Sequence, residues 1–167
     1  MKFDGVDDYV AVNNNLGIFG NAAFSVSAWF KWTDALCPTN FETIFGTTQI
    51  NSTGQSLILT LGSTDCRPTL DFWNARWRAT NPLQPNTWYH IVGVKIPGLI
   101  STTSKIYING IEVPGAVETD MTPNIIDASP VIGRLGVVRY FNGSIDDVRI
   151  YNRALSASEV TQLYNSR

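Results

Sequence analysis

The chain has 167 residues, 44% of them hydrophobic, and its aromatic residues are numerous enough to fill the core of one domain spanning residues 1–167. Twelve basic and fourteen acidic residues leave a net charge of −2, which argues against nucleic acid as a partner, because phosphate binding favours a basic excess. The sequence has no run of about 18 apolar residues, so we expect no membrane span.

Short runs of β-branched and aromatic residues alternate with turn clusters along the whole chain. Tight turns are expected at Asn74-Ala75 and at Asn109-Gly110, the second being the strongest hairpin signal present. Many short strands with regular turns predict an all-β antiparallel sandwich or barrel. The predicted strands are Tyr9–Val12, Phe24–Lys31, Glu42–Phe45, Ser56–Leu61, Thr69–Trp73, Arg76–Ala79, Trp88–Val94, Lys105–Asn109, Ile111–Val113, Val131–Gly133 and Ser144–Tyr151.

The last part of the chain combines a turn, a strand and a helix. Asn142-Gly143 reads as a tight turn, because both residue types accept a positive φ at low cost. Ile145 and Val148 are three residues apart, so a β-bulge at Asp146-Asp147 is needed to place both on one face. The sequence from Ser156 to Glu159 fits a capping box that opens one short C-terminal helix.

Five segments in order resemble the laminin-G-like, concanavalin A-type jelly-roll domains of bacteria. They are FDGVDDYVAV (Phe3–Val12), FSVSAWFKW (Phe24–Trp32), NTWYHIVGVK (Asn86–Lys95), KIYINGIEV (Lys105–Val113) and GSIDDVRIYNRALSASEV (Gly143–Val160). The resemblance covers nearly the whole chain. It implies a two-sheet antiparallel β-sandwich of the jelly-roll type, closed by the short C-terminal helix.

Two acidic clusters lie near the two ends of the chain, and the terminal strands of such a jelly roll are neighbours. We expect a structural Ca²⁺ between them, with Asp4 and Asp146 as the best ligands and Asp7 and Asp147 next. Related glucanases and lectins often carry such an ion, which supports this expectation. The alternative is that the first cluster shapes an Asx-turn and the second pairs with a nearby arginine.

Cys37 and Cys66 are the only cysteines, and both stand in polar, turn-rich stretches. We expect a disulfide between them and an oxidising, extracellular or cell-surface location; the alternative is two unpaired thiols. The residues after Met1 lack the basic segment followed by an apolar stretch that is typical of a signal peptide. We therefore expect a module of a longer secreted chain.

The sequence argues against catalysis. Jelly-roll glucanases of this architecture carry Glu-x-Asp-x-x-Glu on one strand, and no such motif occurs here. The single histidine, His90, lies in an apolar strand, where a structural imidazole is favoured over a general base.

A binding surface is the remaining possibility, and the expected function is non-catalytic carbohydrate binding by a module that is monomeric in isolation. A protein-interaction or adhesion module, or an accessory structural domain beside an enzyme, are the alternatives. Trp29 and Trp88 are expected in the core, whereas burial or exposure stays open for the tryptophans flanked by charged residues. The predicted sugar-binding residues are Trp73, Asn74, Arg76, Trp77 and Arg78, with Trp32 as a second aromatic wall.

Overall fold

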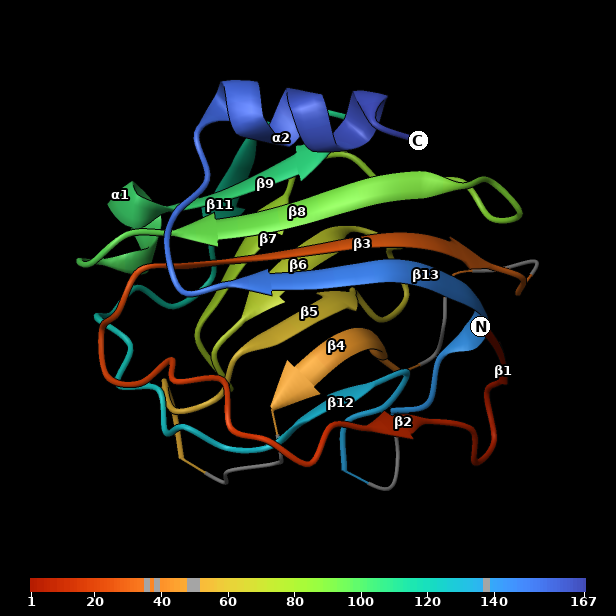
Figure 1. The fold of residues 1–167 in the computed structure, drawn as a ribbon, viewed down its shortest axis with the longest axis horizontal. Helices are drawn as coiled ribbons and strands as arrows, with labels where there is room; N and C mark the ends of the chain where they lie inside the picture. The colour runs from red at the N-terminus through yellow and green to blue at the C-terminus, as the bar shows by residue number, and fades with distance from the viewer. Residues whose placement is uncertain (35–36, 38–39, 48–51, 137–138) are drawn as a thin grey trace.

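The computed structural model describes residues 1–34, 37, 40–47, 52–136 and 139–167, and it contains two antiparallel sheets packed face to face (Figure 1). This arrangement confirms the predicted β-sandwich. One sheet has six strands, in the order β1 (Lys2–Asp4), β13 (Asn142–Tyr151), β3 (Phe24–Trp32), β8 (Tyr89–Lys95), β9 (Ser104–Ile108) and β10 (Ile111–Glu112). The other has seven, in the order β11 (Gly115–Val117), β7 (Arg76–Ala79), β6 (Pro68–Asp71), β5 (Ile58–Leu61), β4 (Glu42–Thr47), β12 (Pro130–Ile132) and β2 (Val10–Ala11).

The core lies between the two sheets and follows the period-two alternation of the strands. In β3, five inward side chains from Phe24 to Trp32 at every second position all join the main core cluster. In β7, Trp77 and Ala79 face the core, while the two arginines of this strand face outward. The hydrophobic pattern of the sequence therefore fixes which face of each strand is buried.

Strand β13 contains the predicted bulge. Its register against β3 shifts between Asp146 and Arg149, and Asp147 has a φ of 48°. The shift lets Ile145 and Val148 both pack on the main core cluster, as their three-residue spacing requires.

Two turn predictions change in the structure. Asn142 and Gly143 open strand β13 and do not form a turn, because Gly143 lies paired between β1 and β3, where a Cβ would meet the backbone of Lys31 and Trp32. The β6–β7 hairpin turns at Trp73-Asn74 and not at Asn74-Ala75. Trp73 and Asn74 have the positive φ values of a tight hairpin turn, 65° and 59°.

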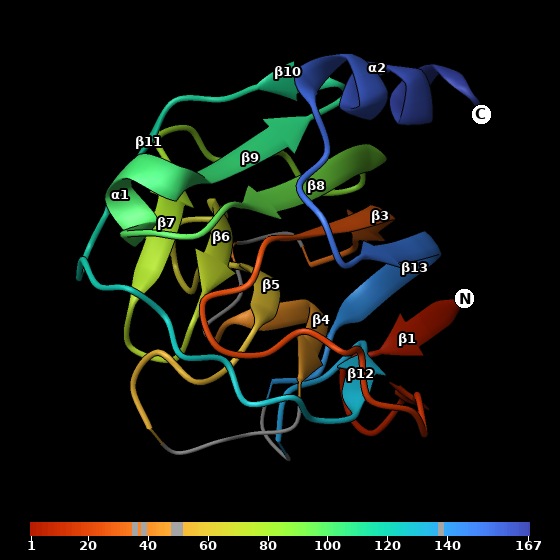
Figure 2. The same cartoon turned by 60° about the vertical axis from the view of Figure 1, so that its left-hand side comes forward.

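Two helices accompany the sheets. The predicted C-terminal helix is α2 (Ala157–Asn165), with the reciprocal capping box between Ser156 and Glu159. Its residue Val160 packs in a second apolar cluster on the outer face of the six-stranded sheet, and Figure 2 shows the helix beside β10. The four-residue α1 (Ile100–Thr103) was not predicted. Neither helix is long or apolar enough to cross a bilayer, as far as the described residues extend.

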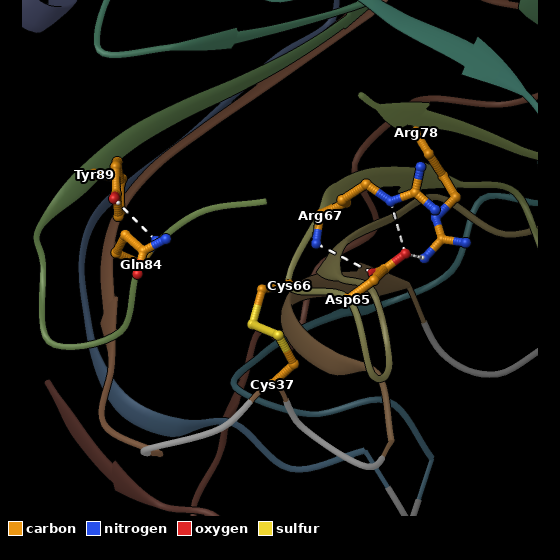
Figure 3. The surroundings of a disulfide bond; sticks show 7 residues. All are labelled: Cys37, Asp65, Cys66, Arg67, Arg78, Gln84 and Tyr89. Carbon is orange, nitrogen blue, oxygen red and sulfur yellow. Dashed lines mark hydrogen bonds and ion pairs between the residues drawn. A yellow bond between two sulfur atoms is a disulfide. The ribbon is translucent and has the colours of Figure 1, made fainter. Parts of the chain in front are cut away.

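The predicted disulfide joins Cys37, in the segment between β3 and β4, to Cys66 in the turn between β5 and β6 (Figure 3). Cys66 is buried against the main core cluster. The adjacent Asp65 carboxylate accepts hydrogen bonds from Arg67 Nε at 2.7 Å and from Arg78 Nη2 at 2.6 Å. The disulfide thus fixes a turn whose carboxylate reaches strand β7.

Candidate functional site

The outer face of the seven-stranded sheet carries polar side chains on two adjacent strands, β6 and β7. Asp71 of β6 stands opposite Arg76 of β7, and Thr69 stands opposite Arg78. Directly paired residues share one face of a sheet, so these four side chains project together, away from the core. The sequence alternation Thr-Leu-Asp and Arg-Trp-Arg produces this face.

A network of charges holds the arginines in place. Arg76 donates from Nε to Asp71 Oδ2 at 3.2 Å and from Nη1 to Glu118 Oε2 at 3.1 Å. Arg78 donates from Nη1 to the other oxygen of Glu118. Burial works to raise the pKa of Glu118, but the hydrogen bonds and charges of the two arginines together lower it below its usual value. Glu118 is therefore an ionised carboxylate held between two guanidinium groups.

Aromatic rings lie against the same network. The guanidinium carbons of Arg76 and Arg139 each lie 4.8 Å from the centre of the Phe41 ring, and that of Arg139 lies 5.4 Å from the centre of the Trp73 ring. We call Phe41, Asp71, Trp73, Arg76 and Arg139 the outer-face site. It combines flat apolar rings with charged hydrogen-bonding groups.

Asp71 is the most buried member of the outer-face site, with a side chain only 1% exposed. Burial raises the pKa of its carboxyl group, and the facing charges of Arg76 and Arg139 oppose that rise. Its Oδ2 accepts from Arg76, whereas Oδ1 has no hydrogen-bond partner in the described part of the chain. This oxygen is also shielded from solvent, so the role of Asp71 in the site is to position Arg76.

Four of the six predicted sugar-binding residues gather on or beside this face. Trp73 and Arg76 belong to the outer-face site, Asn74 is exposed beside Trp73 in the turn, and Arg78 stands in the next row of β7. The sequence did not single out Asp71, Phe41 or Arg139. The one sequence signal that could have pointed to Asp71 was its alternation with Leu70, which predicts that the two side chains lie on opposite faces of the strand.

The prediction that Trp77 and Trp32 line a site is wrong. Trp77 is only 7% exposed and Trp32 is fully buried. Trp77 alternates with two outward arginines, so its ring must face inward. Trp32 ends the inward series of β3, and its ring stacks on those of Phe30 and Tyr89 at centroid distances of 6.1 and 6.2 Å.

Trp88 departs from its expected core position as well, since it is 38% exposed. The following residue, Tyr89, packs against the core, so Trp88 points to the outer face of the six-stranded sheet. There Lys31 Nζ and the Arg167 guanidinium lie 5.6 and 5.5 Å from its ring centre. Trp29 also faces this side, with the Tyr164 ring of α2 stacked on it at 5.6 Å.

The two acidic clusters expected to share a Ca²⁺ are not brought together. Strand β1 pairs with β13 so that Asp4 stands opposite Asn142, which leaves Asp146 four residues, or about 13 Å, further along β13. Asp146 instead pairs with Arg167 at 2.7 Å, and Asp147 pairs with Arg149 at 2.9 Å.

Near the N-terminus, the carboxylates of Asp4, Asp7 and Asp8 lie within 4.8 Å of one another, all exposed. The Asp4 carboxylate accepts hydrogen bonds from the backbone N–H of Val6 at 2.8 Å and of Asp7 at 3.3 Å. The first of these, from Val6, is the main reason why the pKa of Asp4 is lowered. This is the Asx-turn that the sequence offered as the alternative to a metal site.

Comparison with known proteins identifies the family and the fold of the chain. The family model of the concanavalin A-like lectin/glucanases superfamily matches residues 4–161. No curated protein sequence matches the chain. Three of the solved structures that share the fold are 14–23% identical to the chain.

The first is domain 4 of AbnA, a GH43 extracellular arabinanase from Geobacillus stearothermophilus in complex with arabinotriose. It is 22% identical, with a TM-score of 0.65 and coverage of 98% of this chain and 86% of that one. A candidate carbohydrate-binding protein from Bacteroides ovatus is 23% identical, with a TM-score of 0.67 and coverage of 97% and 47%. A heptameric SAP-like pentraxin from Limulus polyphemus is 14% identical, with a TM-score of 0.66 and coverage of 98% and 80%.

The two-sheet sandwich agrees with the family match, which covers nearly the whole length of the chain. The chain belongs to the concanavalin A-like lectin/glucanases superfamily.

Proposed function

We propose that this chain is a non-catalytic carbohydrate-binding module and that the outer-face site binds the sugar. The observation that carries the proposal is the gathering of the Phe41 and Trp73 rings with the guanidinium groups of Arg76 and Arg139 around the buried Asp71 carboxylate. Sugars offer hydroxyl oxygens as acceptors to guanidinium groups and apolar C–H faces to rings such as that of Trp73. Binding sites of this kind combine apolar walls with a few convergent polar groups.

The relatives support this assignment. The superfamily is one of lectins and glucanases, and the arabinanase domain was solved with an arabinose trimer. Arabino-oligosaccharides are therefore the first ligands to test. The disulfide between Cys37 and Cys66 supports an extracellular or cell-surface location for the module.

The charge pairing on this face favours binding over hydrolysis. Asp71 and Glu118 both accept hydrogen bonds from the single guanidinium of Arg76. A glycosidase pair needs one carboxyl group that carries a proton and one that is free to act as nucleophile or base. Two carboxylates neutralised by arginine are better suited to positioning donors around a ligand.

The test is a glycan array followed by calorimetry with the best ligand, for wild type, Trp73→Ala, Asp71→Asn and the control Trp88→Ala. Stacking of a nucleic-acid base on an aromatic side chain contributes about 1–3 kcal/mol. On that scale Trp73→Ala should weaken binding about 5- to 150-fold. Trp88→Ala removes an exposed indole from the opposite sheet and should leave the affinity unchanged.

Absence of binding to any glycan would refute the carbohydrate function. Wild-type affinity in both outer-face variants would place the site elsewhere on the molecule. Circular dichroism of each variant establishes that it is folded before its affinity is compared.

A further inference from the structure

The ion pairs in and beside the outer-face site form one connected row of charges that begins and ends with an arginine. The members of this charge row, in order, are Arg67, Asp65, Arg78, Glu118, Arg76, Asp71 and Arg139. Each carboxylate lies between two guanidinium groups, as Figure 3 shows for Asp65. Because arginines stand at both ends, the charge row is positive, although the whole protein has a net charge of −2.

Arg139 is the member of the charge row that is neutralised least. Its Nη1 lies 4.0 Å from Asp71 Oδ2, whereas Arg76 donates a hydrogen bond to the same oxygen at 3.2 Å. Arg139 donates no hydrogen bond to a carboxylate in the described part of the protein, and that part includes every aspartate and glutamate of the sequence. Its guanidinium group can therefore pair with an added anion without giving up an existing hydrogen bond.

Two aromatic rings hold this guanidinium group beside the surface on which the sugar is proposed to stack. The guanidinium carbon of Arg139 lies 4.8 Å from the centre of the Phe41 ring and 5.4 Å from that of Trp73. The Arg139 side chain is 19% exposed, so solvent reaches part of it. A sugar ring on Trp73 would thus have a cation at its edge.

The chemistry of this cation favours one class of sugar. A uronic acid carries a carboxylate on the edge of its ring and keeps the apolar C–H face that stacks on an indole. A guanidinium group binds a carboxylate through two parallel hydrogen bonds, which are stronger than hydrogen bonds to a neutral hydroxyl. A positive site with a stacking ring therefore suits a uronic acid better than a neutral sugar.

We propose that the outer-face site selects sugars that carry a carboxylate, and that Arg139 is the residue that determines this selectivity. The inference rests on the proposed sugar-binding function and names its ligand class. Arg76 and Arg78 are committed to Glu118 and act as supports, whereas Arg139 pairs with the ligand. Neutral sugars bind the same rings more weakly.

The test is calorimetry with trimers of galacturonic acid and of glucuronic acid, each compared with its methyl ester. The ester keeps the ring and its hydroxyl groups but removes the charge. Wild type should bind at least one acid about tenfold or more tightly than its ester. Added NaCl should weaken the binding of the acid and leave that of the ester nearly unchanged, because salt screens the ion pair.

Arg139→Gln is the diagnostic variant, and its affinities for acid and ester should differ by no more than about twofold. Arg139→Lys keeps the charge but loses the fork, so its preference for the acid should be at least about threefold smaller than that of wild type. Trp73→Ala should weaken acid and ester alike and keep their ratio. The matched control Arg149→Gln removes the same charge from the opposite sheet and should keep the wild-type preference.

The outcomes separate this inference from the proposed function. Equal affinity of wild type for acid and ester, both weakened in Trp73→Ala, would refute the selectivity and leave carbohydrate binding standing. Absence of binding to every acidic and neutral glycan would refute both. A preference that survives in Arg139→Lys and Arg139→Gln, or that disappears in Arg149→Gln, would refute the role of Arg139. If circular dichroism shows that Arg139→Gln is unfolded, Arg139→Lys decides.

Discussion

Trp73 adopts a backbone conformation that bulky residues avoid. Its φ of 65° lies in the left-handed region, where a residue with a Cβ is strained by about 1–2 kcal/mol. Glycine would fit this hairpin turn better. A strained tryptophan whose ring lies beside Arg139 is consistent with a residue kept for its ring and not for its turn.

We therefore predict that Trp73→Gly separates stability from binding. Relief of the turn should offset the lost ring contacts, so the free energy of unfolding should change by no more than about 1 kcal/mol. Sugar affinity should fall as it does in Trp73→Ala. Urea denaturation and calorimetry check the two halves, and a loss of stability above about 2 kcal/mol would show that the indole is mainly structural.

His90 is a buried imidazole on the other side of the molecule. Its Nε2 is 2.8 Å from Ser27 Oγ, and its ring packs beside those of Trp29 and Tyr164 at centroid distances of 5.3 and 6.1 Å. Burial lowers the pKa of His90 to about 4; the nearby charge of Asp147 opposes this shift, and that of Arg149 adds to it.

This lowered pKa predicts a loss of stability in acid. An unfolded histidine titrates near 6.5, so between about pH 6.5 and 4 the unfolded chain binds more protons, and stability falls as the pH falls. Protonation of this residue should lower the free energy of unfolding by about 3 kcal/mol in total. Above pH 7 the residue should not affect the pH dependence of stability. Urea denaturation at several pH values in this range should show a smaller change of unfolding free energy with pH for His90→Gln than for wild type. An equal pH dependence in both proteins would contradict the lowered pKa of His90.

At the scale of elements, the sequence predicts strands well where alternation is long. Phe24 to Lys31 was correctly assigned to β3, and the Ile145–Val148 spacing located the bulge in β13. The sequences of the two-residue strands β2 and β10 and of the short helix α1 are too short to show a hydrophobic pattern. Their ends could therefore not be predicted precisely. They form because a neighbouring element supplies their hydrogen bonds, which local sequence does not report.

Gly143 shows how a residue read as a turn signal can serve close packing. It lies in β13 with β1 on one side and β3 on the other, and a Cβ there would overlap the backbone of Lys31. Backbone atoms of a central strand cannot move aside as a flexible side chain can.

Gly143→Ala should therefore cost about 3 kcal/mol or more, through overlap with β3. Gly17→Ala is the matched control, because Gly17 has a φ of 70° but no atom within 4 Å of an added Cβ. That variant should lose only about 1 kcal/mol from backbone strain. Thermal or urea melts of the two variants measure the difference, and similar losses would indicate that conformation, not contact, selects glycine at both positions.

At the scale of the whole molecule, the two outer faces differ. Helix α2 covers part of the six-stranded sheet, whereas the seven-stranded sheet presents the outer-face site (Figure 2). The sequence singled out the β6–β7 hairpin as a candidate binding site from its aromatic and basic residues. It could not supply Phe41 or Arg139, because these lie 30 residues before and 68 residues after Asp71 and meet it only through the fold.

The same distribution of charge leads to a prediction about catalysis. Around the outer-face site, Glu118 is ionised and bound by Arg76 and Arg78, and Asp71 is buried against Arg76. Both carboxylates accept hydrogen bonds from Arg76, whereas hydrolysis of a glycosidic bond uses one carboxyl group that carries a proton and one that acts as nucleophile or base.

Purified protein should accordingly release no reducing sugar from arabinan, xylan or laminarin above a buffer blank, even under conditions in which it binds one of them. Release that disappears in Asp71→Asn or Glu118→Gln would contradict this and make the site catalytic. Release unaffected by both variants would also contradict the prediction and would place hydrolysis at another site, provided that the activity co-elutes with the purified protein. A module that binds without cleaving stays attached to its polysaccharide, which is the behaviour that the paired charges of this face favour.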